Sequence, residues 1–146
     1  MKNYKKIIIL TVLFVSIAGF AFSSVNSVDA AKTYKTGKMY FKEDKYYPTS
    51  TLNKRIDKNN LITGHYVYPR AKGVMGTPNT LDLGIVGRDL DTPSNYKATK
   101  IIIKFKKKVN NKMYYSTKTF KKSYVQYKPK NNYKPYYSVV YYKKIR

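Results

Sequence analysis

The residues best suited to chemistry in this sequence are lysines and tyrosines in its C-terminal half. Lys104, Lys106 and Lys108 alternate along Thr99–Val109, so in an extended strand they lie on one face about 6–7 Å apart. Rows of positive charge bind polyanions by neutralising their charge and releasing counterions, and tyrosine rings add stacking on bases and contact with sugar rings. We therefore predict a polyanion-binding surface. Its candidate residues are Lys104, Lys106, Lys108, Lys118, Lys121, Lys122, Tyr114, Tyr124 and Tyr127.

Lysine supplies most of this charge, because arginine occurs only at positions 55, 70, 88 and 146. An ammonium group is a point charge without the two-pronged geometry of a guanidinium. This favours charge-dense, non-specific binding over the reading of bases. We expect the partner to be an anionic cell-surface polymer or glycan, with nucleic acid bound only non-specifically. The alternative is a solvated face that merely keeps the protein soluble.

Residues for catalysis are few. His65 is the only histidine, and no G-x-S-x-G elbow accompanies it. A hydrolase with paired acids needs two carboxyl groups facing one substrate, whereas the adjacent Glu43 and Asp44 point to opposite faces of an extended segment. We interpret His65 as an ordinary strand residue and expect a non-enzymatic protein without a cofactor.

One acidic cluster invites a metal-binding interpretation. Asp89 and Asp91 lie close in the sequence to Asp82 and Asn95, and calcium takes 6–8 oxygen ligands that often come from loops. No EF-hand pattern is present, and the segment Asp91-Thr92-Pro93 also fits a turn in which aspartate bonds its own backbone. We therefore expect no metal.

The amino-acid composition excludes further classes of protein and site. The chain has 146 residues, 30 of them basic and 7 acidic, which leaves a net charge of +23. The absence of cysteine excludes disulfide scaffolds, thiol catalysis and Cys-ligated metals. Thr92–Arg146 holds 16 basic residues and no carboxylate side chain. AT-rich codon usage is an alternative source of lysine, but it explains poorly why this half lacks Asp and Glu.

The N-terminus has the layout of a secretory signal peptide. Three lysines in the first six residues precede Ile7–Phe22, an uncharged apolar run of 16 residues that is short for a membrane span. Small residues at Val28 and Ala30 predict cleavage after Ala30, with Ala31 and an uncleaved anchor as the alternatives. We expect residues 1–30 to be removed, leaving no transmembrane span and a chain with 27 basic and 6 acidic residues, a net charge of +21.

Alternating apolar and polar residues predict about seven short strands. We expect one or two in Lys32–Tyr47 and others at Leu61–Tyr68, Leu81–Val86, Thr99–Val109, Met113–Phe120, Ser123–Tyr127 and Tyr136–Tyr142. Thr49–Asn60 is predicted to form a short helix, because Leu52 and Ile56 are four residues apart and Ser50 is a suitable N-cap. Large aliphatic side chains are scarce, so tyrosine is expected to contribute to the core.

Thr99–Val109 and Met113–Phe120 are predicted to pair as a hairpin around Asn110-Asn111. A three-residue loop turns Met113, Tyr115, Thr117 and Thr119 inward and leaves Tyr114 and Lys118 outside. A two-residue loop exchanges the two sets, because a slip of one residue inverts a strand. We prefer the three-residue loop, since it avoids burying Lys118.

These features predict an all-β fold: a small antiparallel β-sandwich (immunoglobulin-like) or a partly open barrel, with residues 31–146 as one basic Tyr/Lys-rich domain. The expected function is that of a secreted, non-enzymatic protein of the cell surface. It would bind anionic polymers of the envelope, namely cell-wall polymers, acidic glycans or lipid headgroups, and be retained non-covalently. The alternatives are a secreted cationic effector acting on competitor or host surfaces and an extracellular nucleic-acid binder. The sequence specifies neither the polymer nor the oligomeric state.

Overall fold

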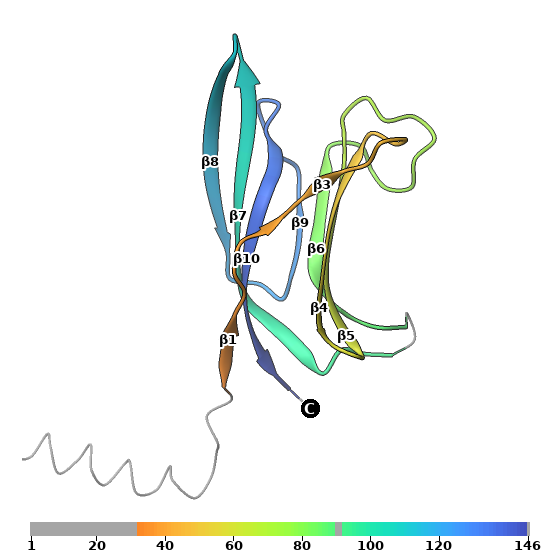
Figure 1. Ribbon diagram of the computed structural model, residues 1–146, viewed down its shortest axis with the longest axis vertical. Coiled ribbons are helices and arrows are strands. Elements are labelled where there is room, and N and C mark those ends of the chain that lie inside the picture. Colours follow the sequence, from red (N-terminus) through yellow and green to blue (C-terminus); the bar gives the residue numbers. More distant parts are fainter. Residues whose placement is uncertain (1–31, 90–91, 146) are drawn as a thin grey trace, which may run out of the picture. The chain divides into compact units, whose positions relative to one another are not determined.

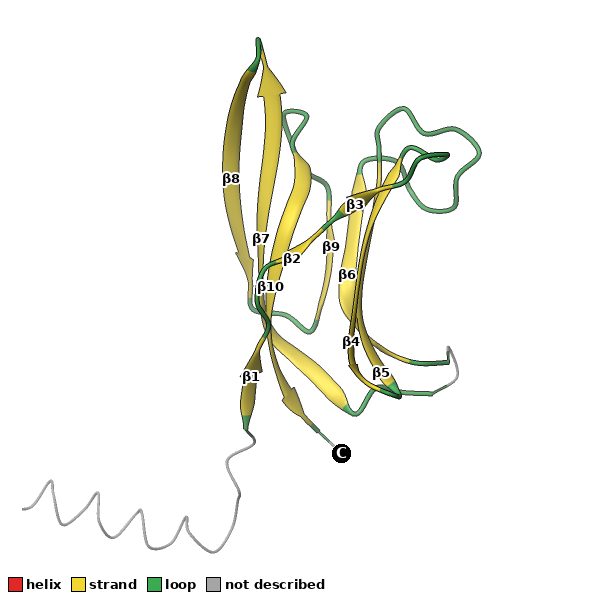
Figure 2. Cartoon of the chain, in the orientation of Figure 1, coloured by secondary structure: helices red, strands yellow, loops and turns green. Residues whose placement is uncertain are grey.

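The computed structural model describes residues 32–89 and 92–145, and the folded part forms one compact unit that begins at Thr33. The predicted signal peptide and Asp91 lie outside the described residues. Ten strands and their connecting loops make up the described part, with no helix in it (Figure 2). No described segment therefore forms a helix long and apolar enough to cross a membrane.

The strands form two antiparallel sheets, and strands far apart in the sequence are neighbours in both (Figure 1). Sheet I contains β1 (Thr33–Lys35), β2 (Met39–Tyr40), β7 (Tyr96–Val109), β8 (Lys112–Phe120) and β10 (Lys134–Lys144). Its order is β1-β10-β7-β8, and β2 also pairs with β10. Sheet II contains β3 (Lys42–Glu43), β4 (Thr49–Asp57), β5 (Asn60–Val67), β6 (Thr80–Gly87) and β9 (Tyr124–Tyr127) in the order β3-β4-β5-β6-β9. The predicted all-β antiparallel fold is confirmed, and its two sheets are consistent with the β-sandwich or partly open barrel expected from the sequence.

The inner faces of the two sheets pack together around a single hydrophobic core. It consists of Met39, Leu52, Ile62, Tyr66, Leu81, Leu83, Ala98, Ile101, Ile103, Phe105, Val125 and Val140. Every second residue of β7 from Ile101 to Phe105 contributes, which follows from the two-residue period of a strand. Tyr66 is buried among them, and its hydroxyl donates a hydrogen bond to Asn79 Oδ1 at 3.0 Å. Tyrosine thus does contribute to the core, with its polar end satisfied.

The predicted helix at Thr49–Asn60 is wrong, because this segment forms strand β4. β4 pairs along its length with β5, from Thr49 opposite Val67 to Asp57 opposite Asn60. A pairing shift between Arg55 and Asp57 lets Ile56 pack against the core. Two apolar residues spaced four apart give only a weak helical preference, and long-range pairing with β5 overrides it.

The preferred three-residue hairpin loop is also wrong. Val109 pairs with Lys112, so Asn110 and Asn111 alone form the loop, with φ of 49° and 62°. Positive φ at both central residues is the geometry of a type I′ turn, which suits the twist of a hairpin. The set Met113, Tyr115, Thr117 and Thr119 therefore faces outward, and the set Tyr114, Ser116, Lys118 and Phe120 faces inward. Phe120 packs against the core in this register, whereas Lys118 stays exposed because β8 is the edge strand of its sheet.

Candidate functional site

The two sheets differ sharply in charge. The strands of sheet I carry 12 lysines and no Asp or Glu, whereas the strands of sheet II carry three basic and three acidic residues. Most of sheet I comes from residues 92–146, a segment without carboxylate side chains. Folding therefore converts an asymmetry along the sequence into an asymmetry between two layers.

The outer face of sheet I places lysine ammonium groups over tyrosine rings. Lys100 Nζ lies 4.0 Å from the centre of the Tyr141 ring, and Lys106 Nζ lies 4.6 Å from that of Tyr136. Lys104 Nζ lies 4.9 Å from the Tyr115 ring centre. We call this surface the Lys/Tyr face. Its members are Lys35, Lys38, Lys100, Lys104, Lys106, Tyr40, Tyr115, Tyr136, Tyr137 and Tyr141.

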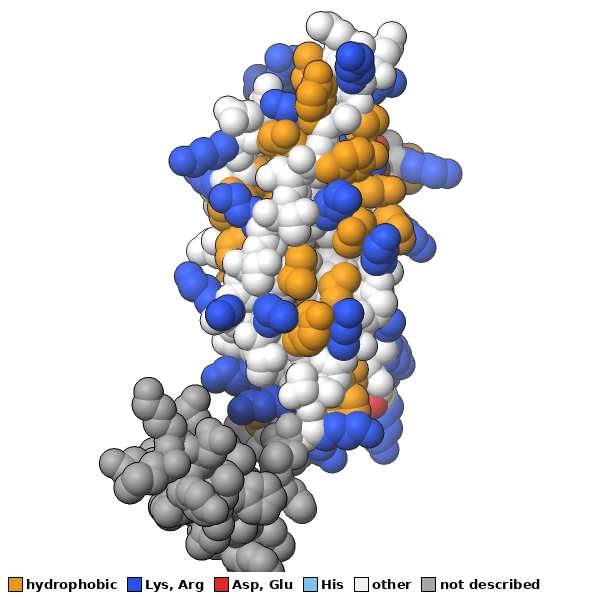
Figure 3. All heavy atoms as spheres, turned by 90° about the vertical axis from the view of Figure 1, so that its left-hand side faces the viewer, with side chains coloured by type: hydrophobic (Ala, Val, Ile, Leu, Met, Phe, Trp, Pro, Cys, Tyr) orange, Lys and Arg blue, Asp and Glu red, His pale blue; other side chains and the backbone are white. Residues whose placement is uncertain are grey.

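A β-bulge in β10 enlarges the aromatic part of the Lys/Tyr face. Pro135 pairs with Phe105 and Tyr137 with Lys104, so Tyr136 is an extra residue on β10. A bulge sets two residues of one strand against one of its neighbour, and both Tyr136 and Tyr137 contact the outer Tyr40, at ring-centre distances of 5.3 and 5.5 Å. Figure 3 shows the result, with lysine side chains interleaved with hydrophobic ones across this face.

Packing on the rings orders the lysine side chains. Lys100, Lys104 and Lys106 are half-buried rather than fully exposed, and their ammonium groups lie near tyrosine ring centres. A cation over an aromatic ring gains about 0.5–1 kcal/mol at an exposed site. Side chains already held in place lose less entropy when a ligand binds them. The contacts with the rings thus favour the side-chain positions that these lysines have in the structure.

The structure brings together only part of the predicted polyanion-binding set. Lys104 and Lys106 belong to the Lys/Tyr face, and Lys108 lies on the same side, paired with Met113 near the hairpin end. Lys118 and Tyr114 face inward because of the two-residue loop, and Tyr127 of β9 packs against the core. Lys118 Nζ lies 5.6 Å from the Tyr127 ring centre, so these two are neighbours on the other side of β8.

Lys121, Lys122 and Tyr124 are not members of the Lys/Tyr face. The two lysines follow β8 and line a hollow together with Lys97 and Lys143. Tyr124 belongs to sheet II and donates a hydrogen bond to Asp82 Oδ1 at 2.7 Å. Burial and this carboxylate raise the pKa of Tyr124 to about 12. Its ring lies over Gly84, where a Cβ atom would come within 2.8 Å of Tyr124 Cδ2, so Tyr124 has a structural role there.

None of the five tyrosines of the Lys/Tyr face is among the predicted binding residues. Tyr40 comes from β2, far away in the sequence, and Tyr136 reaches the face only through the bulge. The one available signal was the Asn110-Asn111 pair, since asparagine at both loop positions favours a two-residue turn and thereby turns Tyr115 outward.

The acidic residues considered for a metal do not gather in the described part. Among residues 32–89 and 92–145, no three His, Cys, Asp or Glu side chains are close enough to hold a metal ion. Asp82 accepts the Tyr124 hydrogen bond on sheet II, and the backbone N–H of Thr92 donates to the carbonyl of Asp89 at 2.9 Å, as in a turn. Asp91 lies outside the described residues.

Comparisons of the chain with protein-family models, with curated proteins and with solved structures found no match.

Proposed function

We propose that this protein is secreted and adheres, without catalysis, to anionic polymers of the cell envelope through the Lys/Tyr face. The observation that carries the proposal is the array of lysines held over tyrosine rings on a sheet whose strands contain no carboxylate side chain. Such an array attracts a polyanion over its whole length, because no negative group within its strands competes for the ammonium groups.

The charge arrangement favours a binding role over one of solubility alone. A surface that serves solubility mixes positive and negative side chains. The strands of sheet I carry only positive ones and place lysines opposite each other, as with Lys97 and Lys143. Like charges opposite each other in a sheet reduce stability. An anionic ligand would relieve that repulsion on binding, which accounts for an arrangement that folding by itself disfavours.

The chemistry of the face indicates the class of polymer. Lysine ammonium groups recognise charge density without fixed geometry, and the tyrosine rings between them offer flat surfaces for sugar rings. A linear wall phosphodiester polymer or an acidic glycan offers both negative charge for the lysines and sugar rings for the tyrosines. Anionic lipid headgroups offer the negative charge. The two-sheet architecture supports this role as a rigid platform. We retain an immunoglobulin-like sandwich only as an architectural analogy, because one fold hosts many functions.

Salt dependence of binding tests the proposal. Duplex DNA serves as a calibrated polyanion, for which log affinity falls with log salt at about 0.9 per phosphate neutralised. A glycerol-phosphate polymer and hyaluronate represent the two polymer classes. The triple variant Lys100→Gln, Lys104→Gln and Lys106→Gln should lower the DNA slope by up to about three if each lysine contacts one phosphate.

The matched control is the triple variant Lys45→Gln, Lys54→Gln and Lys58→Gln. It removes the same charge from exposed positions on or next to sheet II and should leave the slope nearly unchanged. Salt-insensitive binding, or equal losses in both triple variants, would contradict the proposal. In culture, high salt should release the protein from washed cells. Killing of other cells by the purified protein would instead favour a cationic effector.

A further inference from the structure

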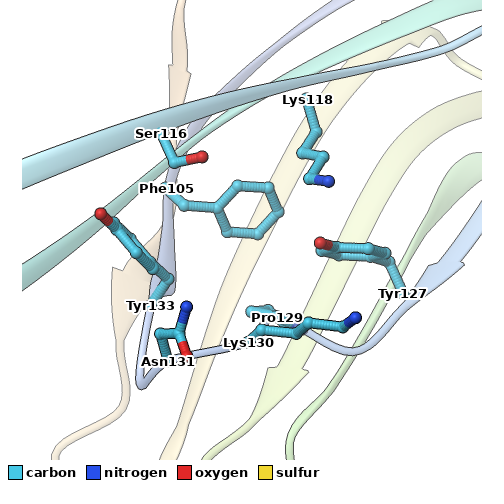
Figure 4. Close-up of a pocket in the computed structure, with 8 residues that line it drawn as sticks. All are labelled: Phe105, Ser116, Lys118, Tyr127, Pro129, Lys130, Asn131 and Tyr133. Atoms are coloured by element: carbon cyan, nitrogen blue, oxygen red, sulfur yellow. The ribbon is translucent and has the colours of Figure 1, made fainter.

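A pocket lies on the inner side of the β7–β8 hairpin, across strand β8 from the Lys/Tyr face. It is lined by Phe105, Ser116, Lys118, Tyr127, Pro129, Lys130, Asn131 and Tyr133, and its volume is about 210 Å³ (Figure 4). These residues come from β7, β8, the end of β9 and the loop before β10. The pocket exists because the two-residue hairpin loop turns Ser116 and Lys118 inward.

The lining combines cations, aromatic rings and neutral polar groups. Lys118 enters from β8 and Lys130 from the opposite loop, and the Tyr127 hydroxyl points toward Phe105 between them (Figure 4). Lys107 Nζ lies 4.6 Å from the Tyr133 ring centre, which adds a third cation beside the pocket. Ser116 and Asn131 supply a hydroxyl and an amide. No acidic side chain lines the pocket.

The loop that forms the floor of the pocket is a turn held by hydrogen bonds. Asn131 and Asn132 have φ of 58° and 62°, and the Tyr133 N–H donates to the Lys130 carbonyl at 3.3 Å, so the segment is a tight turn. Asn79 Nδ2 donates to the carbonyl of Pro129 at 3.2 Å, and Asn79 also accepts the bond from the buried Tyr66. The turn is thereby tied to the core, and its groups are placed before any ligand arrives.

We propose that this pocket binds a single acidic sugar residue: a ring of pyranose size that carries one carboxylate or phosphate group. Ligand pockets usually measure about 300–1,000 Å³, and a volume of about 210 Å³ suits one ring rather than an oligomer. The anionic substituent lies between Lys118 and Lys130, the apolar side of the ring lies against Tyr127 and Tyr133, and the ring hydroxyls bond Asn131 and Ser116.

This inference rests on the proposed function and names the unit recognised within the polymer. The two sides of β8 have different roles. Tyr115 on one side belongs to the Lys/Tyr face, which holds the polymer by its charge, and Lys118 on the other side lines the pocket. The face recognises charge density, whereas the pocket recognises one ring with its substituent.

An NMR titration of the ¹⁵N-labelled protein tests the pocket with glucuronic acid, glucose 6-phosphate, glucose and inorganic phosphate. At least one of the two acidic sugars should shift the amide signals of Ser116, Lys118, Lys130 and Asn131 in a saturable way. Glucose and inorganic phosphate should bind at least tenfold more weakly. A response to glucuronic acid alone indicates an acidic glycan as the source, and one to glucose 6-phosphate alone indicates a phosphate-bearing polymer. Absence of saturable shifts, or inorganic phosphate binding as well as the sugar phosphate, would overturn the proposal.

Two charge-matched variants separate this inference from the proposed function. Lys118→Gln with Lys130→Gln should weaken acidic-sugar binding at least tenfold and change polymer binding little. Lys104→Gln with Lys106→Gln should weaken polymer binding and change acidic-sugar binding little. All four lysines are at least partly exposed, so both variants should fold, which thermal unfolding checks. Salt-dependent polymer binding without acidic-sugar binding would contradict the pocket proposal and support the Lys/Tyr face. Acidic-sugar binding with salt-insensitive polymer binding would support the pocket and contradict the proposed role of the Lys/Tyr face.

Discussion

Lys97 of β7 and Lys143 of β10 lie directly opposite each other in sheet I, and both line a hollow with Lys121 and Lys122. Four lysines thus line one hollow, and no carboxylate side chain is among its lining residues. Cross-strand pairs contribute roughly 0.2–1 kcal/mol, and like charges act against the fold. The arrangement is a cost to stability that an anionic ligand would remove.

Reversing one charge of this pair should stabilise the protein and weaken its adhesion. Lys143→Glu places a carboxylate opposite Lys97, and we expect the free energy of unfolding to rise by about 0.2–1 kcal/mol. Affinity for anionic polymers should fall at low salt. Urea unfolding and a polymer-binding assay measure the two effects. Lys144→Glu is the control, because Lys144 pairs with Tyr96 rather than with a lysine and should gain less stability from the same change in charge.

The two faces of β7 should respond differently to the same substitution. Ile103 is completely buried, so Ile103→Ala should cost about 2–5 kcal/mol of unfolding free energy. Ile102 is the next residue on the same strand and lies on the outer, partly exposed side. Ile102→Ala should therefore cost clearly less. Equal losses in urea unfolding would contradict the assignment of inner and outer faces.

The hairpin turn should depend on the backbone conformation of asparagine. Asn111 has a φ of 62°, a conformation that costs most L-residues about 1–2 kcal/mol and costs glycine almost nothing. We expect Asn111→Gly to leave stability nearly unchanged and Asn111→Val to lower it by at least about 1 kcal/mol. Unfolding midpoints compare the two variants, and backbone NMR contacts check that Val109 still pairs with Lys112. A valine variant as stable as the glycine variant would argue against the two-residue turn.

Glu43 of β3 and Lys134 of β10 form an ion pair between the two sheets, and acid should weaken it. The hydrogen bond from Lys134 is the main cause that holds the pKa of Glu43 below its ordinary value of 4.5. The folded state therefore prefers the ionised carboxylate. Its contribution to stability is fully present above pH 4.5 and is lost as the pH falls through the lowered pKa.

Glu43→Gln should remove this part of the pH dependence. The variant should be less stable than the parent at pH 7, and the difference should shrink by pH 3, as measured by urea unfolding at both values. Some acid sensitivity should remain, because hydrogen bonds from Asn59 and Asn60 also lower the pKa of Asp57. A difference between parent and variant that stays constant from pH 7 to pH 3 would exclude the ion pair as its source.

Several features of this protein follow from the sequence alone. The alternation of Ile101, Ile103 and Phe105 with lysines specifies a strand with one buried face, because successive side chains point to opposite sides. The strand pattern therefore predicts the all-β class. The absence of carboxylate side chains after Asp91 and the resulting positive charge of this segment are likewise properties of the sequence.

Other features depend on contacts between distant parts of the chain. The segment from Thr49 is a strand because β5 offers its backbone groups as partners, which two apolar residues in the sequence do not reveal. Lys118 faces inward because burial of Phe120 against the core and the Asn110-Asn111 turn select one register, and a shift by one residue would move every side chain of β8 to the other side. Tyr40, Tyr115 and Tyr136 share a face only because β2, β8 and β10 meet in one sheet. The spacing of residues in the sequence specifies which side chains alternate along a strand. The side that each set occupies depends on which register buries the most apolar surface. The buried apolar surface is defined only once the two sheets pack together.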